Sequence, residues 1–196
     1  MCGIIGVIGH SKVSSLLIEG LKRLEYRGYD SAGIATLLNG KIDRRRSLGK
    51  IENLKRLLKK SPIKGNVGIG HTRWATHGIP SKTNAHPHSS GDVAVVHNGI
   101  IENYDELRKK LEKKNFIFES DTDTEVIAHL ISYFLKKNLT PLKATITALK
   151  KVEGAFALGI IFSGINNYLI CAKRGSPLAI GKGKNCNYIG SDSIAL

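Results

Sequence analysis

Cysteine follows the initiator methionine directly, at position 2, and precedes the segment Gly3-Ile4-Ile5-Gly6. If Met1 is removed, Cys2 carries both a thiol and a free α-amine on one residue. The ordinary pKa of such an amine is about 7.7–8.0 and that of a thiol about 8.5, so the two groups can exchange a proton near neutral pH. The position therefore predicts a thiol nucleophile that its own amine activates. It equally suits a small apolar residue that begins a buried strand.

Three further regions concentrate charged, hydroxyl, histidine and glycine residues. They are Tyr26–Gly33 (YRGYDSAG), His71–His88 with the runs HTRWATHG and NAHPH, and His97-Asn98-Gly99 together with Asp121-Thr122-Asp123. An asparagine amide beside a glycine can donate hydrogen bonds to a developing oxyanion, because glycine lets the backbone approach a substrate closely. The dipeptide Asn98-Gly99 is also typical of a plain turn. Asp123 also suits the first turn of a helix, where the helix dipole favours an acid.

The elements that must position these residues follow from the apolar pattern. We expect strands at Gly3–Gly9, Ile34–Leu38, Lys41–Arg45, Val67–His71, Asp92–His97, Phe116–Phe118, Phe156–Phe162, Tyr168–Ala172, Leu178–Gly181 and Cys186–Ile189. We expect helices at Ser11–Tyr26 with Ser11 as cap, Ile51–Lys60, Tyr104–Lys114, Thr122 to about Lys136, and Thr140 to about Val152–Gly154. Asn39-Gly40 is typical of a type I′ turn and predicts a hairpin.

Two helix starts have recognisable signals. Thr122-Asp123-Thr124-Glu125 has the spacing of a capping box, and Thr140-Pro141 places proline at the first helical position. The expected strands gather toward both ends of the chain, and most of the helices lie between them. This order favours an α+β layered architecture over a regular alternation of strands and helices.

Length and composition describe an ordinary globular chain. The 196 residues are 41% hydrophobic and 23% charged, which suits one domain with a sizeable core. We find no apolar run long enough for a membrane span and no signal peptide, so we expect a cytoplasmic protein. Cys2, Cys171 and Cys186 form no CxxC pair, which argues against a disulfide framework. The last residues resemble the start of another element, so we expect a domain that is truncated at its C-terminus.

The formal net charge of +14 raises the question of nucleic-acid binding. The lysines occur in scattered pairs within expected helices, which is typical of solvated helix faces and not of one basic groove. These pairs are Lys59-Lys60, Lys109-Lys110, Lys113-Lys114, Lys136-Lys137 and Lys150-Lys151. The aromatic content of 6% also offers few stacking platforms. We therefore expect no nucleic-acid partner.

The motifs quoted above resemble those of a known family. MCGIIG is similar to the start of class II glutamine amidotransferases, which are N-terminal nucleophile hydrolases. YRGYDSAG, HTRWATHG and NAHPH resemble the glutaminase domains of the enzymes that aminate fructose 6-phosphate, whereas purine-pathway relatives carry other residues there. The resemblance covers essentially all 196 residues. It implies a four-layer αββα sandwich, an α+β fold of the N-terminal nucleophile hydrolase type.

The resemblance also implies a role for each motif residue. Cys2 would attack the side-chain amide of L-glutamine, and the Asn98 side chain and Gly99 backbone N–H would hold the oxyanion. The other substrate-binding residues implied are Arg73 on the α-carboxylate, Asp123 on the α-ammonium, and Trp74, Thr76 and His77 on a loop that closes over glutamine. Arg27 would order the N-terminus. No cofactor is implied.

The resemblance further implies a larger enzyme. Ammonia released by this domain would pass to a C-terminal sugar-phosphate isomerase domain, which binds fructose 6-phosphate and is absent from this chain, in a full-length protein that is a homodimer. Two alternatives stay open: another class II amidotransferase with a different acceptor, or a catalytically silent fragment that acts as a binding module. Five histidines lie between His71 and His97, but their spacing fits no usual zinc pattern, so we expect no metal.

Overall fold

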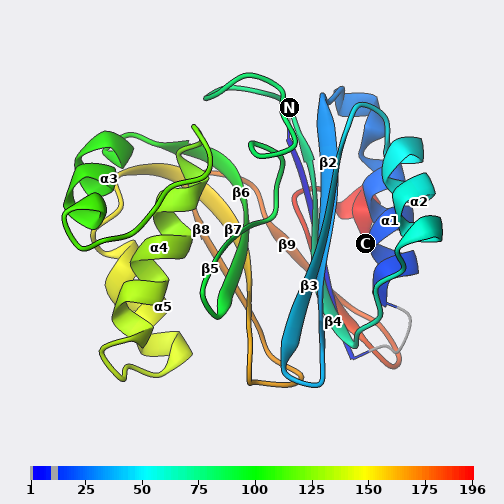
Figure 1. The fold of residues 1–196 in the computed structure, drawn as a ribbon. Coiled ribbons are helices and arrows are strands. Elements are labelled where there is room, and N and C mark those ends of the chain that lie inside the picture. The colour runs from blue at the N-terminus through cyan, green and yellow to red at the C-terminus, as the bar shows by residue number, and fades with distance from the viewer. Residues whose placement is uncertain (1, 10–12) are drawn as a thin grey trace.

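Two antiparallel β-sheets lie face to face in the computed structural model, which describes residues 2–9 and 13–196. Helices cover the outer face of each sheet, so the layers run helix, sheet, sheet, helix (Figure 1). This is the four-layer α+β sandwich predicted from the sequence. Ser11, the predicted cap of the first helix, lies outside the described residues.

The larger sheet has six strands in the order β3-β2-β4-β1-β10-β9. Its strands are β1 (Gly3–Ile8), β2 (Ser31–Leu38), β3 (Lys41–Leu48), β4 (Val67–Arg73), β9 (Ala179–Lys182) and β10 (Asn187–Gly190). The strand that follows Cys2 is therefore central, with β4 on one side and β10, from the far end of the sequence, on the other. Asn39 and Gly40 have φ angles of 50° and 75°, as the predicted type I′ hairpin between β2 and β3 requires.

The smaller sheet has four strands in the order β5-β6-β7-β8. They are β5 (His88–Ser90), β6 (Val93–Ile101), β7 (Gly154–Phe162) and β8 (Leu169–Arg174). The sequence analysis missed β5, a strand of 3 residues between the expected strands Val67–His71 and Asp92–His97. Its pairing with β6 places His88 opposite Val95.

Helices α1 (Val13–Arg23) and α2 (Ile51–Lys60) cover the six-stranded sheet, together with the short 3-10 turns η1 (Glu25–Arg27) and η2 (Ser193–Ala195). Helices α3 (Tyr104–Glu112), α4 (Thr124–Leu135) and α5 (Pro141–Leu149) cover the four-stranded sheet. Of these, α4 packs directly on β5 and β6, and α3 and α5 pack beside it. In the described part of the chain no helix has the length and apolar character needed to cross a bilayer.

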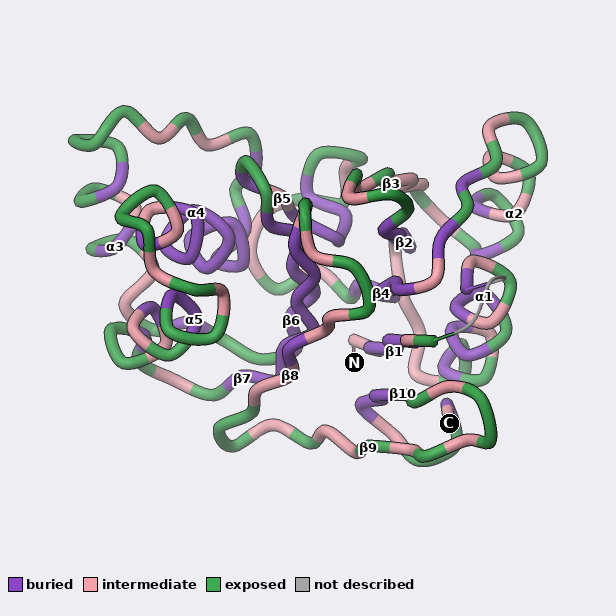
Figure 2. Tube along the Cα trace, turned by 90° about the horizontal axis from the view of Figure 1, so that it is seen from below, coloured by how far each residue is buried: buried purple, intermediate pink, exposed green. Residues whose placement is uncertain are grey.

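Successive side chains along each strand point to opposite faces of the sheet and so pack into different apolar layers. Among the described residues there are three such layers: one between each sheet and its helices, and one between the two sheets. On β1, Ile5 and Val7 face the helices, whereas Ile4 faces the other sheet. On β6, Val93 and Val95 pack toward α4, whereas Ala94 and Val96 fill the space between the sheets. The period of two that strands impose therefore gives each sheet two buried faces. Figure 2 shows this burial along β1, β4 and β6, and the exposed outer turns of the helices.

Two predictions about the chain before α4 are wrong. Phe116–Phe118 is not a strand: the segment has no regular structure, and Phe116 and Phe118 instead pack their rings on His129 of α4. The capping box also does not form, because the Glu125 carboxylate accepts the backbone N–H groups of Glu119 and Ser120. Helix α4 nevertheless begins at Thr124, close to where the sequence predicted it.

Candidate active site

Cys2 lies at the end of β1 where the two sheets meet. Its Sγ atom is 3.3 Å from the backbone nitrogen of Trp74, which follows β4 in the larger sheet. Its carbonyl oxygen accepts a hydrogen bond of 3.0 Å from the Nδ2 atom of Asn98, which belongs to β6 in the smaller sheet. Cys2 is thus held by both sheets.

Burial is the largest influence on the Cys2 thiol and raises its pKa above the ordinary value. The backbone hydrogen bond with Trp74 and the charge of Arg73 act in the opposite direction, but they do not cancel the effect. A thiol with a raised pKa stays protonated near neutral pH. Nucleophilic attack by Cys2 therefore needs a nearby base that accepts the proton.

Arg27 connects Cys2 to the other end of the chain. Its Nη1 atom donates to the Cys2 carbonyl oxygen at 3.3 Å, and its Nη2 atom contacts the Asp192 carboxylate at 2.6 Å. Tyr26 donates its hydroxyl to the same carboxylate at 2.6 Å. These contacts, with the Tyr26 hydrogen bond as the largest, lower the pKa of Asp192 to about 2. The sequence analysis did not single out Asp192, because nothing near it in the sequence marks it.

Gly99 follows Asn98 and has a backbone that other residues adopt with difficulty. Its φ angle is +133°, and a Cβ atom there would lie 2.0 Å from the carbonyl oxygen of Ala155 on β7. The position therefore requires glycine both for its conformation and for the close approach of β6 to β7. Asn98-Gly99 is part of β6 and is not the plain turn that its composition also suggested.

Arg73 ends β4, and its side chain is buried. Its guanidinium donates to the carbonyl oxygens of His77, of Gly78 at 2.8 Å and of Ile79 at 3.4 Å. One guanidinium thereby shapes the loop that follows β4. Asp30 also holds this loop, since its carboxylate accepts the backbone N–H of Ala75 at 2.6 Å.

The side chains of that loop lie around Cys2. Trp74 is 53% exposed and covers Gly28, where a Cβ atom would lie 2.7 Å from the indole ring. The His77 ring meets the Tyr104 ring edge-on, with centroids 5.1 Å apart. Gly28 therefore leaves space for the indole that any larger residue would occupy.

Asp123 is buried at the start of α4, and its carboxylate does not cap that helix. Oδ2 instead accepts the backbone N–H of Ile101 at 2.9 Å, at the end of β6. Oδ1 lies 3.9 Å from Nδ1 of His97. Asp123 thus connects α4 to the strand that carries Asn98.

Buried histidines form a network behind these residues, and the sequence analysis assigned them no individual roles. His71 and His86 stack with ring centroids 4.1 Å apart. The Thr124 hydroxyl lies 2.8 Å from Nε2 of His86 and 2.9 Å from Nδ1 of His97. Burial lowers the pKa of His71 to about 3 and lowers that of His86 and His97 as well. Uncharged imidazoles therefore lie beside the site, and the first residue of α4 connects two of them.

Two cavities meet at Cys2, and together they are lined by every residue that the sequence analysis predicted for the site. The smaller has about 20 Å³, and Arg73, His77 and Asp123 line it with Cys2. The larger has about 250 Å³, and its lining includes Arg27, Asn98 and Pro177. Cys2, Trp74, Thr76 and Gly99 line both cavities.

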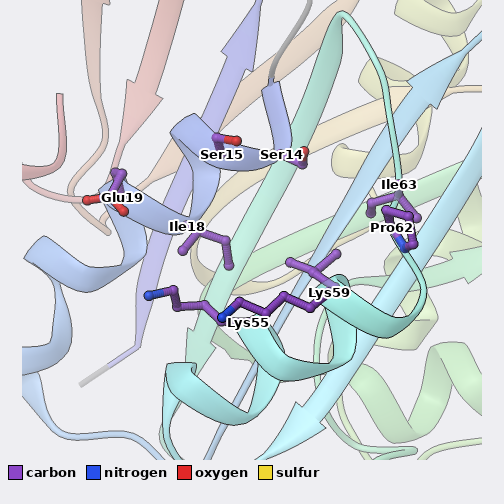
Figure 3. Close-up of a pocket in the computed structure, with 9 residues that line it drawn as sticks. Ser14, Ser15, Ile18, Glu19, Lys55, Lys59, Pro62 and Ile63 are labelled. Carbon is purple, nitrogen blue, oxygen red and sulfur yellow. The ribbon is translucent and has the colours of Figure 1, made fainter.

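A third cavity, of about 290 Å³, lies between α1 and α2 (Figure 3). Ser14, Ile18, Lys55 and Lys59 are among its lining residues. It belongs to the outer helix layer and contains none of the predicted site residues. Among residues 2–9 and 13–196, no group of three or more His, Cys, Asp or Glu side chains is placed so that it could hold a metal ion.

The fold and this site define a class of protein. Residues 71–196 match the family described as "Glutamine amidotransferase domain". Glutamine phosphoribosylpyrophosphate amidotransferase of B. subtilis, solved with ADP and GMP, superposes with a TM-score of 0.85 at 30% identity, over 99% of this chain and 42% of that one. The chain therefore belongs to the glutamine amidotransferase family and has its N-terminal nucleophile hydrolase fold.

Sequence comparison identifies particular relatives within the family. The chain is 57% identical over 196 residues to the isomerizing glutamine–fructose-6-phosphate aminotransferase of Mesorhizobium japonicum. It is 54% identical over 197 residues to the enzyme of that name from Gluconobacter oxydans. Each alignment includes 100% of this chain and 32% of the relative, so the chain spans about a third of the length of these proteins. A class-II glutamine aminotransferase domain protein from Silicibacter pomeroyi shares the fold, with a TM-score of 0.65 at 14% identity over 97% of this chain and 88% of that one.

Proposed function

We propose that this chain catalyses the glutaminase half-reaction of a glutamine amidotransferase, with Cys2 as the nucleophile. The observation that carries the proposal is the position of the Cys2 thiol where two cavities meet. The buried side chains of Arg73 and Asp123 line one of these cavities. Glutamine is a zwitterion, and Arg73 and Asp123 supply the two opposite charges that its α-carboxylate and α-ammonium need.

The reaction begins when Sγ of Cys2 attacks the side-chain amide carbon of glutamine. The thiol proton passes to the α-amine of Cys2, which is free once Met1 is removed, and from there to the departing amide nitrogen. The Asn98 amide and the Gly99 N–H bind the oxyanion, and each such donor is worth about 3–4 kcal/mol of barrier. Ammonia leaves, a glutamyl thioester remains on Cys2, and water then hydrolyses it to glutamate.

Substrate entry requires the loop after β4 to move. The cavity beside Arg73 and Asp123 has about 20 Å³, which is room for about one water molecule. Glutamine has ten non-hydrogen atoms and needs far more space. We propose that the loop bearing Trp74, Thr76 and His77 opens to admit glutamine and then closes over it. In this structure the Arg73 guanidinium donates to carbonyl oxygens of this loop, and we propose that the glutamine α-carboxylate replaces some of these acceptors.

The remaining steps belong to the longer protein. The relatives' name joins glutamine to fructose 6-phosphate, and we propose that ammonia made here aminates fructose 6-phosphate on a sugar-phosphate isomerase domain outside this chain. We further propose that this chain is one glutaminase domain, that the whole enzyme is a homodimer, and that it works in the cytoplasm. With the full-length chain, formation of glucosamine 6-phosphate from glutamine and fructose 6-phosphate tests the acceptor. Failure with that sugar but ammonia transfer to another acceptor would favour the rival amidotransferase.

The direct test uses 6-diazo-5-oxo-L-norleucine, a glutamine mimic that alkylates amidotransferase cysteines. Intact mass spectrometry before and after incubation should show loss of Met1 and one adduct, and the Cys2→Ala variant should form none. Glutamate release from glutamine should likewise depend on Cys2. A processed protein that forms no adduct and releases no glutamate would overturn the proposal and favour a silent binding module.

A further inference from the structure

His71 connects the two sheets at the edge of the active site. It lies on β4 two residues beyond Ile69, whose side chain belongs to the apolar layer between the sheets. Asn98 lies on β6 two residues beyond Val96, which belongs to the same layer. Because side chains two residues apart on a strand share a face, His71 and Asn98 extend that layer as polar residues.

The contacts of His71 determine which ring nitrogen carries its proton. Nε2 lies 2.9 Å from the carbonyl oxygen of His97 and 3.0 Å from Oδ1 of Asn98. Both partners are acceptors, so Nε2 must be the donor. Nδ1 is buried and has no hydrogen-bond partner among the described residues, as expected for the unprotonated nitrogen. Burial also lowers the pKa of His71 to about 3, so the ring stays neutral at physiological pH.

This donor fixes the orientation of the Asn98 amide. With Oδ1 on His71, the Nδ2 group faces Cys2 and donates to its carbonyl oxygen at 3.0 Å. A flipped amide would set Nδ2 against the Nε2–H of His71 and Oδ1 against the Cys2 carbonyl, which opposes donor to donor and acceptor to acceptor. An amide nitrogen carries two hydrogens, so one can hold Cys2 while the other is directed to an oxyanion.

We propose that His71 is a positioning residue, which holds the Asn98 amide with its N–H groups toward Cys2 so that they can bind the oxyanion formed from glutamine. The inference rests on the proposed glutaminase function. His71 itself lines neither of the two cavities that meet at Cys2. Its effect on catalysis is exerted through Asn98. Experiments that remove Asn98 can therefore distinguish His71 from a residue that only stabilises the fold.

A double-mutant cycle tests this dependence. Removing one oxyanion donor typically lowers kcat by about 10²–10³-fold, and we expect this of Asn98→Ala. His71→Leu keeps the size of the side chain but removes the donor, and we expect a fall in kcat of about 10–100-fold with KM changed less than about threefold. In the Asn98→Ala background the same substitution should change kcat less than about threefold. His71→Gln, which places an amide N–H near the position of Nε2, should restore most of the activity.

A matched control separates this effect from the loss of a buried histidine in general. His129 is also buried, and its Nδ1 bonds the Ser90 hydroxyl at 2.8 Å on the helix side of the sheet. His129→Leu should lower the free energy of unfolding but leave kcat and KM for glutamine unchanged. Equal losses from His71→Leu in the wild-type and Asn98→Ala backgrounds would overturn the inference, because His71 would then act independently of Asn98.

A spectroscopic measurement distinguishes this inference from the proposed function. The side-chain ¹⁵N–¹H signals of Asn98, assigned by their absence in Asn98→Asp, should shift and broaden in His71→Leu and return in His71→Gln. An inactive wild-type protein in which these signals depend on His71 would refute the glutaminase proposal and keep the positioning of Asn98. If the protein is active but the Asn98 signals are the same in wild type and His71→Leu, the positioning role of His71 is refuted and the glutaminase proposal stands.

Discussion

Replacing Gly99 with alanine should damage the active site through the backbone. The added Cβ atom would lie 2.0 Å from the Ala155 carbonyl oxygen, whereas real Cβ contacts are essentially never under 3.0 Å, so β6 and β7 must separate by about 1 Å at this point. The φ angle of +133° adds strain of about 1–3 kcal/mol for a residue with a side chain. We expect the free energy of unfolding to fall by about 3 kcal/mol in total.

The functional loss should be larger than the strain alone explains. Asn98 and the Gly99 N–H sit where the two strands must part, and a displacement of 1 Å at a reacting centre can lower the rate by about 10²-fold. We therefore expect kcat/KM for glutamine to fall by about 10²-fold in Gly99→Ala. Glutamate release measures the activity, and urea unfolding at pH 7.5 measures the stability.

Gly164→Ala is the matched control. Gly164 also has a positive φ angle, +77°, but nothing lies within 4 Å of the position that a Cβ atom would take. This variant should lose only the conformational strain of about 1–2 kcal/mol and keep full activity. The reasoning is refuted if Gly99→Ala is no less stable than Gly164→Ala and keeps activity within threefold of wild type. A destabilised but fully active Gly99→Ala would keep the steric argument and reject the link to catalysis.

Three further predictions follow from other parts of the structure. Trp74 is the one tryptophan of the chain and is 53% exposed, so glutamate binding should shift its emission to shorter wavelength, and no shift would count against loop closure. Burial lowers the folded-state pKa of His71, His86, His88 and His97 below the ordinary 6.5, to about 3 for His71 and His88, so the unfolded state binds more protons. The contribution of these histidines to stability is therefore complete above about pH 6.5. It should fall by about 1.4 kcal/mol per pH unit for each of His71 and His88 as the pH drops toward 3, whereas a constant urea midpoint from pH 7 to 5 would contradict this. Because burial raises the pKa of Cys2, its alkylation by iodoacetamide in a chain that retains Met1 should be slow at pH 7 and accelerate above pH 9, and fast reaction at pH 7 would contradict this.

Local signals in the sequence were sufficient for most of the elements. Helix α2 runs over Ile51–Lys60 as predicted, because a clear apolar period ends at Ser61-Pro62. Asn39-Gly40 specified its hairpin through the two positive φ angles that type I′ turns require. The motif residues from Cys2 to Asp123 line the two cavities that meet at Cys2, although their roles in catalysis stay predictions.

The errors come from contacts between residues distant in the sequence. Phe116 and Phe118 alternate as in a strand, but the cause is their packing on His129 of α4 and not a neighbouring strand. Asp123 sits at a helix start, yet its carboxylate bonds Ile101, which is 22 residues earlier. His71 and Asp192 could not be assigned from the sequence, because their partners Asn98 and Arg27 lie on other elements.

The position of β1 between β4 and β10 affects the order of synthesis, removal of Met1 and folding. Ile5 pairs with Gly190, and the Ile4 N–H donates to the Ser191 hydroxyl, 187 residues away. Contacts between such distant residues form late in folding, and on a ribosome they must wait until the last strand has been made. Synthesis at about 5–20 residues per second leaves β1 without its β10 neighbour for roughly ten seconds or more, although β4 is made earlier. An aminopeptidase that removes Met1 would have that interval in which to act, before β10 completes the sheet around β1 and Cys2 becomes half-buried.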